Sequence, residues 1–353
     1  MKLAIERAET STQPVTQTPN SVLTYRRFAF DGGNRFIKWV SPDHQPRCIP
    51  SYIKPLEDWE DALPDSDTMI IESNGVRYVV GQVAQELKGK PTYQHSKANL
   101  AQKLFLAALE PTEDRTHILI DTLVVTTPDT RDQQAVKRLT ALQGLHQFKR
   151  NGVEIAAKIN RVEVVDECLS AWRYAWNQGL FSYHRKNAVL DLGGGTALAR
   201  VILPNGLIER AADVKLPGTF DLANKIAAAL KARSEYSPDL GLIMDAIATG
   251  TFTIGPRQSF AGLFERCRQD WLADIQATLR ETWVKQAAEI GEVQLSVDRL
   301  PWPRLWPRPA TDGSRFLNSP APNSSASMDC WRTKPWRKHG LSCGKSISPL
   351  PMT

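Results

Sequence analysis

Apolar and polar positions follow two patterns that alternate along this chain. Short apolar runs of strand length are separated by segments in which apolar residues recur every three or four positions, the spacing of amphipathic helices. The predicted strands or strand pairs are 25–31, 36–40, 116–128, 152–167, 186–203 and 289–295. The predicted helices are 98–110, 131–144, 168–180, 222–234 and 262–290, and 75–87 predicts a strand followed by a helix. This alternation predicts an α/β fold.

One unit of this pattern occurs twice, about 160 residues apart. The stretches DGGNRFIKW and DLGGGTALARV each continue an apolar strand that ends in an aspartate, Asp31 or Asp191. A glycine-rich turn and a returning strand follow in both cases. The duplication predicts two similar hairpins, one in each half of the chain.

The two turns have the composition of phosphate-binding loops. Glycine lets backbone N–H groups approach an anion without a Cβ in the way, and Lys38 can add an ammonium to the same phosphate. The candidate phosphate contacts are Gly32, Gly33, Asn34, Lys38, Gly193, Gly194, Gly195 and Thr196. Two facing hairpins would hold the β- and γ-phosphates between two lobes, and Asp31 and Asp191 would hold Mg²⁺ through water. One glycine turn alone would indicate only a β-turn, and the chain has neither a GxxxxGK[ST] nor a GxGxxG motif.

Hydrolysis of a bound nucleotide needs a polar group that orients or deprotonates a water molecule. Glu167 is the favoured candidate, because it follows a predicted strand and heads a predicted helix. Asp166 is adjacent and is the alternative. An acid at a helix start can also serve only the helix dipole.

With these motifs, the chain resembles the actin, Hsp70 and sugar-kinase superfamily, and within it the ParM/StbA and archaeal actin-like proteins. The resemblance covers about residues 25–295 and rests on the segments DGGNRFIK, VVDECLSA, DLGGGT and LPGTFDLANKI. It implies a two-lobed actin-like (ribonuclease-H-like) fold with a nucleotide cleft between the lobes. It also implies a glutamate at the position of Glu167, and an adenosine side at Gly218 and the helix that follows it. Asn224 and Lys225 of this helix either face the base or ribose or are exposed to solvent.

For function, the resemblance implies an ATPase that binds Mg²⁺ and ATP and forms filaments for plasmid or DNA segregation, with a DNA-bound adaptor protein as a partner. Direct nucleic-acid binding is not expected. The alternatives are a small-molecule kinase or phosphatase of the same superfamily, or an inactive truncated product. Trp172 and Trp176 are expected to serve packing, and His95 and His184 to lie on the surface.

Composition changes this picture mainly at the two ends. Residues 1–24 are rich in Thr, Gln and Pro and predict a disordered leader. No apolar run is long enough for a membrane span. Five scattered cysteines without metal spacing favour reduced thiols and a cytoplasmic protein. The predicted lobes are 25–180 and 181–295.

Residues 296–353 differ from the rest of the chain. They contain four of the ten Trp, nine of the 23 Pro, nine Lys/Arg and three Asp/Glu, which leaves 35 of each charge in residues 1–295. The formal charge of +6 therefore lies in this segment. It is interpreted as a Pro/Trp-rich disordered tail, out of frame by one base near Leu295, since the shifted frame permits the glycine turn GGSAPLA. In the resembling family, such a turn closes over the adenosine.

Overall fold

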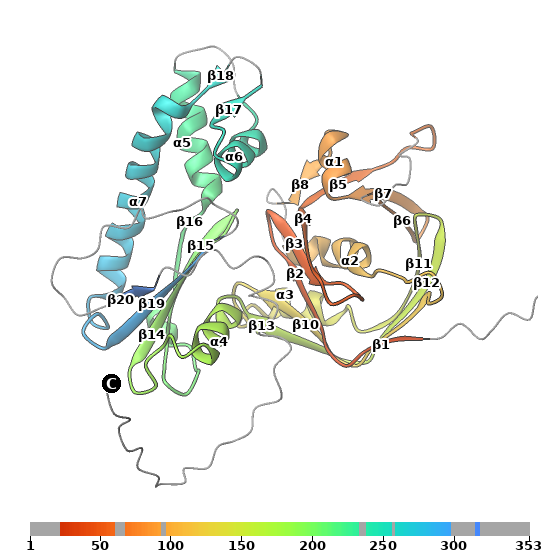
Figure 1. Cartoon of the computed structure of the whole chain (residues 1–353), viewed down its shortest axis with the longest axis horizontal. Coiled ribbons are helices and arrows are strands. Elements are labelled where there is room, and N and C mark those ends of the chain that lie inside the picture. Colours follow the sequence, from red (N-terminus) through yellow and green to blue (C-terminus); the bar gives the residue numbers. More distant parts are fainter. Residues whose placement is uncertain are drawn as a thin grey trace, which may run out of the picture.

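The computed structural model describes residues 22–60, 68–92, 97–232, 238–255, 258–297 and 315–317. Residues 1–21 and most of the segment 296–353 lie outside this part, and the frameshift hypothesis falls there. The described chain forms two lobes that lie side by side (Figure 1). Among the described residues, no helix has the length and apolar character of a membrane span.

The first lobe contains two sheets around a central helix, α2 (Lys97–Ala108). The five-stranded sheet has the order β13-β10-β2-β3-β4, and the eight-stranded sheet has the order β1-β9-β12-β11-β6-β7-β5-β8. The strands of the first are β2 (Phe28–Gly32), β3 (Phe36–Val40), β4 (Pro46–Pro50), β10 (Leu123–Thr127) and β13 (Val162–Asp166). Those of the second are β1 (Leu23–Tyr25), β5 (Tyr52–Pro55), β6 (Met69–Ser73), β7 (Val76–Val80), β8 (Lys90–Pro91), β9 (His117–Ile120), β11 (Gly144–Arg150) and β12 (Val153–Ile159). The short helix α1 (Gln82–Glu86) and α3 (Gln133–Thr140) complete the lobe.

The second lobe has one five-stranded sheet in the order β16-β15-β14-β19-β20. Its strands are β14 (Lys186–Leu192), β15 (Thr196–Ile202), β16 (Val214–Pro217), β19 (Ile290–Val297) and β20 (Arg315–Leu317). The helices are α4 (Leu169–Asn177), α5 (Thr219–Lys231), α6 (Leu240–Thr249) and α7 (Ala261–Trp283), with the 3-10 helix η2 (Arg210–Ala212) and the hairpin β17 (Thr253–Ile254) and β18 (Gln258–Ser259).

The two five-stranded sheets have the same topology. In each, a hairpin and a third antiparallel strand lie on one side, and two parallel strands lie on the other. β20 therefore occupies in the second sheet the position that β13 occupies in the first. The predicted α/β fold of two similar lobes is confirmed, and the repeated hairpins β2–β3 and β14–β15 are the corresponding parts of the two lobes.

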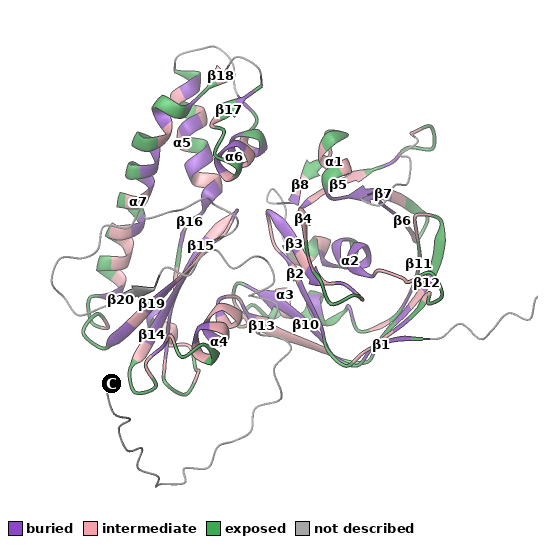
Figure 2. Cartoon of the chain, in the orientation of Figure 1, coloured by how far each residue is buried: buried purple, intermediate pink, exposed green. Residues whose placement is uncertain are grey.

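Each lobe has its own apolar core (Figure 2). In the first lobe, α2 inserts Leu104 and Phe105 between the sheets, and neither side chain is accessible to solvent. In the second lobe, α5 and α7 pack against one another and against the sheet. α4 packs with Val189, Leu198 and Ile202 of that same sheet. The helix that follows Glu167 therefore joins the core of the second lobe.

Three sequence predictions need correction, and two elements were missed. The predicted single strand 116–128 is two strands, β9 and β10, which lie in different sheets. The segment 25–31 breaks in the same way into β1 and β2, because β1 pairs with β9 while β2 pairs with β10. Helix α6 and strand β11 were not expected, and the helix predicted over 262–290 ends at Trp283.

Candidate functional site

The first glycine turn lies between β2 and β3. Asp31 and Lys38 are cross-strand partners in this hairpin, and the Lys38 Nζ lies 3.7 Å from Asp31 Oδ2. The other carboxylate oxygen of Asp31 accepts a 2.7 Å hydrogen bond from the Thr126 hydroxyl of β10. A Cβ on Gly33 would stand 2.6 Å from the Phe36 carbonyl oxygen, so this turn can only close with glycine at that position.

The second glycine turn lies between β14 and β15, beneath the start of α5. The Thr219 N–H donates to the Gly193 carbonyl at 3.1 Å, and the Phe220 N–H donates to the Gly194 carbonyl at 2.8 Å. Gly218 allows this approach, because a Cβ there would stand 2.7 Å from the Thr196 nitrogen. The helix start thus brings its positive end to the second turn, where it favours an anion.

The two turns meet across the lobes. A Cβ on Gly194 would stand 2.3 Å from the Arg35 Cβ, and one on Gly195 would stand 2.8 Å from the Asn34 amide nitrogen. Arg35 and Asn34 belong to the first turn and the two glycines to the second. The structure therefore brings together the two segments that the sequence analysis paired.

The acidic residues are connected to these turns through a short series of contacts. Thr126, which holds Asp31, precedes Thr127, whose carbonyl accepts a 2.8 Å hydrogen bond from the Glu167 N–H. The next residue, Cys168, places its Sγ 4.0 Å from Asp191 Oδ2. Burial, and then the charge of Asp191, raises the pKa of the Cys168 thiol well above its usual value. Asp31, Glu167 and Asp191 thus surround one junction between the lobes.

Asp166, the alternative to Glu167, is occupied by other partners. Its side chain is buried and accepts hydrogen bonds from Arg210 and from the Thr130 N–H and hydroxyl, the last at 2.8 Å. Burial alone would raise the pKa of Asp166, but the bonds from Arg210 and Thr130 and the charge of Arg200 lower it. A carboxylate held this firmly is poorly suited to accept a proton from water, and Glu167 is half-buried instead.

The predicted adenosine contacts lie further along α5. Gly218 stands at the start of this helix, against the second turn. Asn224 is exposed, and Lys225 forms a 3.0 Å ion pair with Asp274 of α7. The ammonium of Lys225 is therefore directed to α7, while Gly218 remains with the phosphate-loop residues.

Several residues of this junction had no role in the sequence analysis. Arg35 lies inside the first quoted motif, but its partners Met244 and Asp245 are on α6, which the periodicity did not predict. Thr126 is the second example. Its sequence signal was only a hydroxyl at the end of a buried strand, and its partner Asp31 lies 95 residues away.

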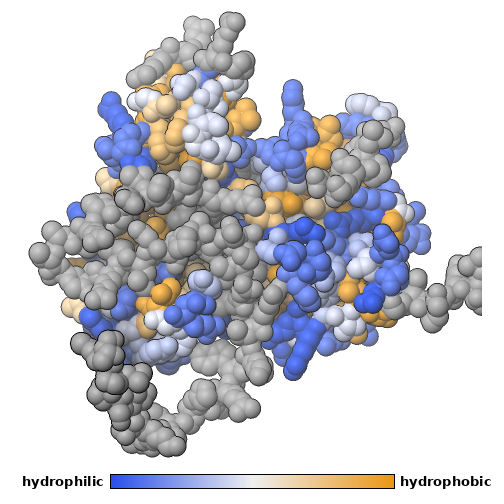
Figure 3. Space-filling model, viewed as in Figure 1, coloured by the Kyte–Doolittle hydropathy of each residue, from blue (hydrophilic) through white to orange (hydrophobic). Residues whose placement is uncertain are grey.

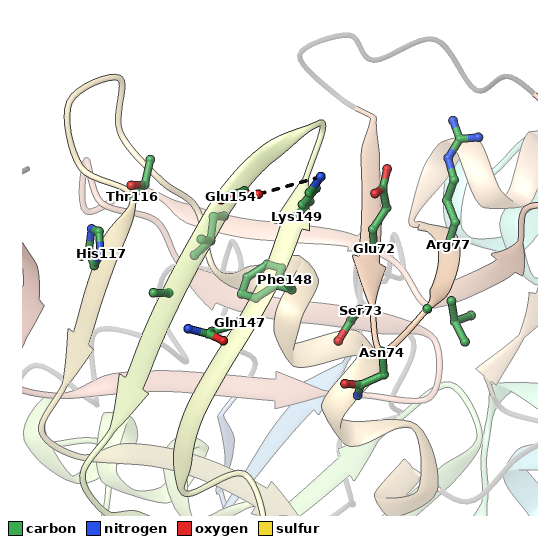
Figure 4. A pocket seen from close by; sticks show the side chains of 14 residues that line it. Glu72, Ser73, Asn74, Arg77, Thr116, His117, Gln147, Phe148, Lys149 and Glu154 are labelled. Atoms are coloured by element: carbon green, nitrogen blue, oxygen red, sulfur yellow. Dashed lines mark ion pairs between the residues drawn. The ribbon is translucent and has the colours of Figure 1, made fainter.

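A cavity of about 950 Å³ lies elsewhere, on the first lobe (Figure 4). Its wall comes from β6, β7, β9, β11 and β12, and includes the Lys149–Glu154 ion pair of 3.9 Å. None of the predicted site residues lines it. A second cavity, of about 850 Å³, includes Arg35 and Asp245 and so borders both lobes. Among the described residues, no group of three or more His, Cys, Asp or Glu side chains could hold a metal ion.

Comparison with known proteins finds one matching family model and several similar solved structures. Residues 29–169 match the model for the N-terminal domain of actin-like proteins. The fold is similar to that of Ta0583, an archaeal actin homologue, with a TM-score of 0.64 and 14% identity over 78% of this chain and 88% of that one. The structure of Ta0583 in complex with ADP has a TM-score of 0.60 and 13% identity, over 77% of this chain and 87% of that one. The structure of a ParM filament from Clostridium botulinum has a TM-score of 0.61 and 12% identity, over 87% of this chain and 99% of that one. No curated protein matches the chain.

Proposed function

We propose that this chain is an actin-like protein of the ParM type, which binds Mg²⁺ and ATP between its lobes and hydrolyses the nucleotide. The observation that supports this most is the direct contact of the two glycine turns, Asn34–Arg35 against Gly194–Gly195. Each turn follows a strand that has an aspartate next to its last residue, and the two turns belong to different lobes. A triphosphate held by both turns would join the lobes.

The residues present suit a magnesium-bound triphosphate. Mg²⁺ in phosphate sites keeps several waters and takes one or two carboxylates, so Asp31 and Asp191 are a sufficient protein contribution. The ion would neutralise phosphate charge when bound. Gly33, Gly193 and Gly218 have no room for a Cβ, so the backbone of both turns packs closely and carries no side chain at these positions.

Glu167 is the proposed catalytic residue. It directly follows β13, and its N–H donates to the carbonyl of Thr127, the neighbour of the threonine that binds Asp31. The next residue, Cys168, contacts Asp191. A carboxylate there can orient a water toward the terminal phosphorus and hold the proton it loses. Lys38, which pairs with Asp31, can stabilise charge on the same phosphate.

We also propose that the protein is cytoplasmic and assembles into nucleotide-dependent filaments that segregate plasmid or other DNA through an adaptor protein. The filament structure of the C. botulinum ParM supports self-association on this fold. On the face shown in Figure 3, hydrophobic residues gather near the upper end of the second lobe. Leu242 of α6 is 48% exposed, and such surface is suited to contact a second copy.

The test combines binding, hydrolysis and sedimentation. Asp191→Ala should lower Mg·ATP affinity at least tenfold, because one of two metal carboxylates is lost, while Glu167→Ala should keep affinity and lose most hydrolysis. Wild-type protein should sediment with ATP and not with ADP. Equal ATP affinity of wild type and Asp191→Ala would contradict the site. Phosphate transfer to a small acceptor without sedimentation would instead indicate a kinase.

The unusual composition after residue 295 calls for a separate test. β19 ends at Val297, opposite Leu192 and next to the second turn, so the chain that follows starts beside the proposed site. We propose that this following segment is out of frame. Sequencing the DNA around codons 290–300 tests this, and a confirmed reading with no open shifted frame would exclude it.

A further inference from the structure

Arg200 joins the two lobes directly behind Glu167. It lies on β15 of the second lobe, and its side chain is 1% exposed. Its guanidinium donates to the Glu167 carbonyl at 2.7 Å and to the carbonyl of Pro128, which follows β10 of the first lobe. The same side chain donates to Asp213 Oδ1 at 2.9 Å. One arginine thus binds the ends of two first-lobe strands from a second-lobe strand.

The backbone that Arg200 binds has an unusual conformation. Cys168, directly after Glu167, has φ of 73°, in the left-handed region that residues with a Cβ rarely adopt. Such a conformation persists only where the surroundings hold it. Here the Glu167 N–H is held by the Thr127 carbonyl, and the Glu167 carbonyl is held by Arg200. The peptide units on both sides of the Glu167 Cα are therefore fixed.

We propose that Arg200 is a positioning residue for Glu167, which fixes the direction of this side chain from the opposite lobe. The inference rests on the proposed hydrolytic function. It goes beyond it by making the orientation of the acid depend on how the second lobe is placed. Arg200 itself touches neither turn in the described hydrogen bonds, so it acts through the Glu167 backbone.

The chain provides a matched control in Arg210. Arg200 forms ion pairs with Asp166 and Asp213. Arg210 binds these two acids as well, each at 3.1 Å from its Nη1. Its described hydrogen bonds go to these acids and to Thr130, whereas Arg200 also reaches Glu167 and Pro128. Conversion of either arginine to lysine keeps the charge but loses the planar fork. The pair therefore separates a general loss of the ion cluster from loss of the contact to Glu167.

The kinetic test compares Arg200→Lys with Arg210→Lys. Arg200→Lys should lower kcat for ATP hydrolysis about tenfold and leave KM for ATP within twofold, whereas Arg210→Lys should keep both within twofold. In the Glu167→Ala background, Arg200→Lys should cause no further loss, because the side chain it orients is gone. An equal fall in both backgrounds, or equal effects of the two lysine variants, would overturn the proposal.

A second measurement does not require activity. Native protein is treated with iodoacetamide, and labelling of Cys168 is followed by peptide mass spectrometry. Release of the Glu167 carbonyl should speed labelling of this buried thiol at least fivefold in Arg200→Lys, and not in Arg210→Lys. If Arg200→Lys does not fold, Arg200→Gln serves instead, since it removes the guanidinium that donates to the Glu167 carbonyl and leaves the partners of Arg210 in place. Unchanged labelling in the folded variant would refute the positioning role, while absent ATP hydrolysis in wild type would refute only the proposed function.

Discussion

At the scale of single residues, the glycines of the second turn have two physical tasks. They carry no Cβ that would hinder the approach of an anion to their backbone N–H groups. Gly194 also gives the space into which the Arg35 side chain packs, since a Cβ would stand 2.3 Å from the Arg35 Cβ. The first task was predicted from the motif DLGGGT, and the second exists only because the other lobe lies there.

Gly194→Ala should therefore disturb the contact between the turns. The added methyl group should lower the free energy of unfolding by about 1–3 kcal/mol, the usual cost of overpacking. Chemical denaturation measures this. Gly262→Ala in α7 is the control, because nothing lies within 4 Å of the added Cβ. It should leave stability unchanged or raise it by about 0.5–1 kcal/mol. Equal stability of both variants would show that the turns do not pack as described.

At the scale of elements, charged residues tie β13, β15 and η2 together. Asp166 ends β13, Arg200 lies on β15 and Arg210 is in η2. The Arg200–Asp166 ion pair measures 3.3 Å, and both side chains are buried. A buried acid between two arginines stays ionised, because burial is outweighed by its hydrogen bonds and the arginine charges. The cluster therefore stabilises the junction only while Asp166 is charged.

This cluster predicts a pH dependence of stability. The folded state lowers the pKa of Asp166, so the unfolded chain binds its proton more readily. The stabilisation is present above about pH 4, the unfolded pKa of an aspartate, and is lost as the pH falls through the lower folded value. Urea unfolding between pH 7 and 3 should show this loss. Asp166→Asn should be less stable at pH 7 and depend less on pH below 4, and an unchanged slope would contradict the assignment.

At the scale of the whole molecule, helix α6 of the second lobe contacts the first lobe next to the glycine turns. Arg35 donates to the Met244 carbonyl at 2.6 Å and to Asp245 at 3.3 Å. Gln85 of α1 donates to the other oxygen of Asp245. A Cβ on Gly241 would stand 2.2 Å from the Tyr52 hydroxyl, so the chains are in close contact there too. These contacts hold the lobes together next to the turns.

Asp245→Ala should loosen this contact between the lobes. Loss of the hydrogen bonds from Arg35 and Gln85 should cost about 1–3 kcal/mol in favour of an open arrangement, since one partner is charged. Small-angle scattering should show a larger radius of gyration for the variant. Asp274→Ala, which removes an ion pair within the second lobe, should leave the radius unchanged. A radius equal to wild type in Asp245→Ala would mean that other contacts suffice.

Prediction from the sequence succeeded where the signal was local. The strand predicted over 36–40 and the helix predicted over 98–110 correspond closely to β3 and α2. Prediction failed where a strand is broken by its pairing. The segments 25–31 and 116–128 each break into two strands, because their first halves pair in one sheet and their second halves in another. The stretch 240–249 was not recognised as α6, because it is apolar along almost its whole length and so shows no clear polar face.

The sequence by itself determined many of the strands, most helices, the two glycine turns and the acids just before them, because periodicity and turn chemistry act over a few residues. Only the tertiary structure decided which residues meet across the lobes. Arg200 reaches Glu167 over 33 positions and Arg35 reaches Asp245 over 210. No local pattern records such contacts, since they exist only after two separate cores have formed and packed together.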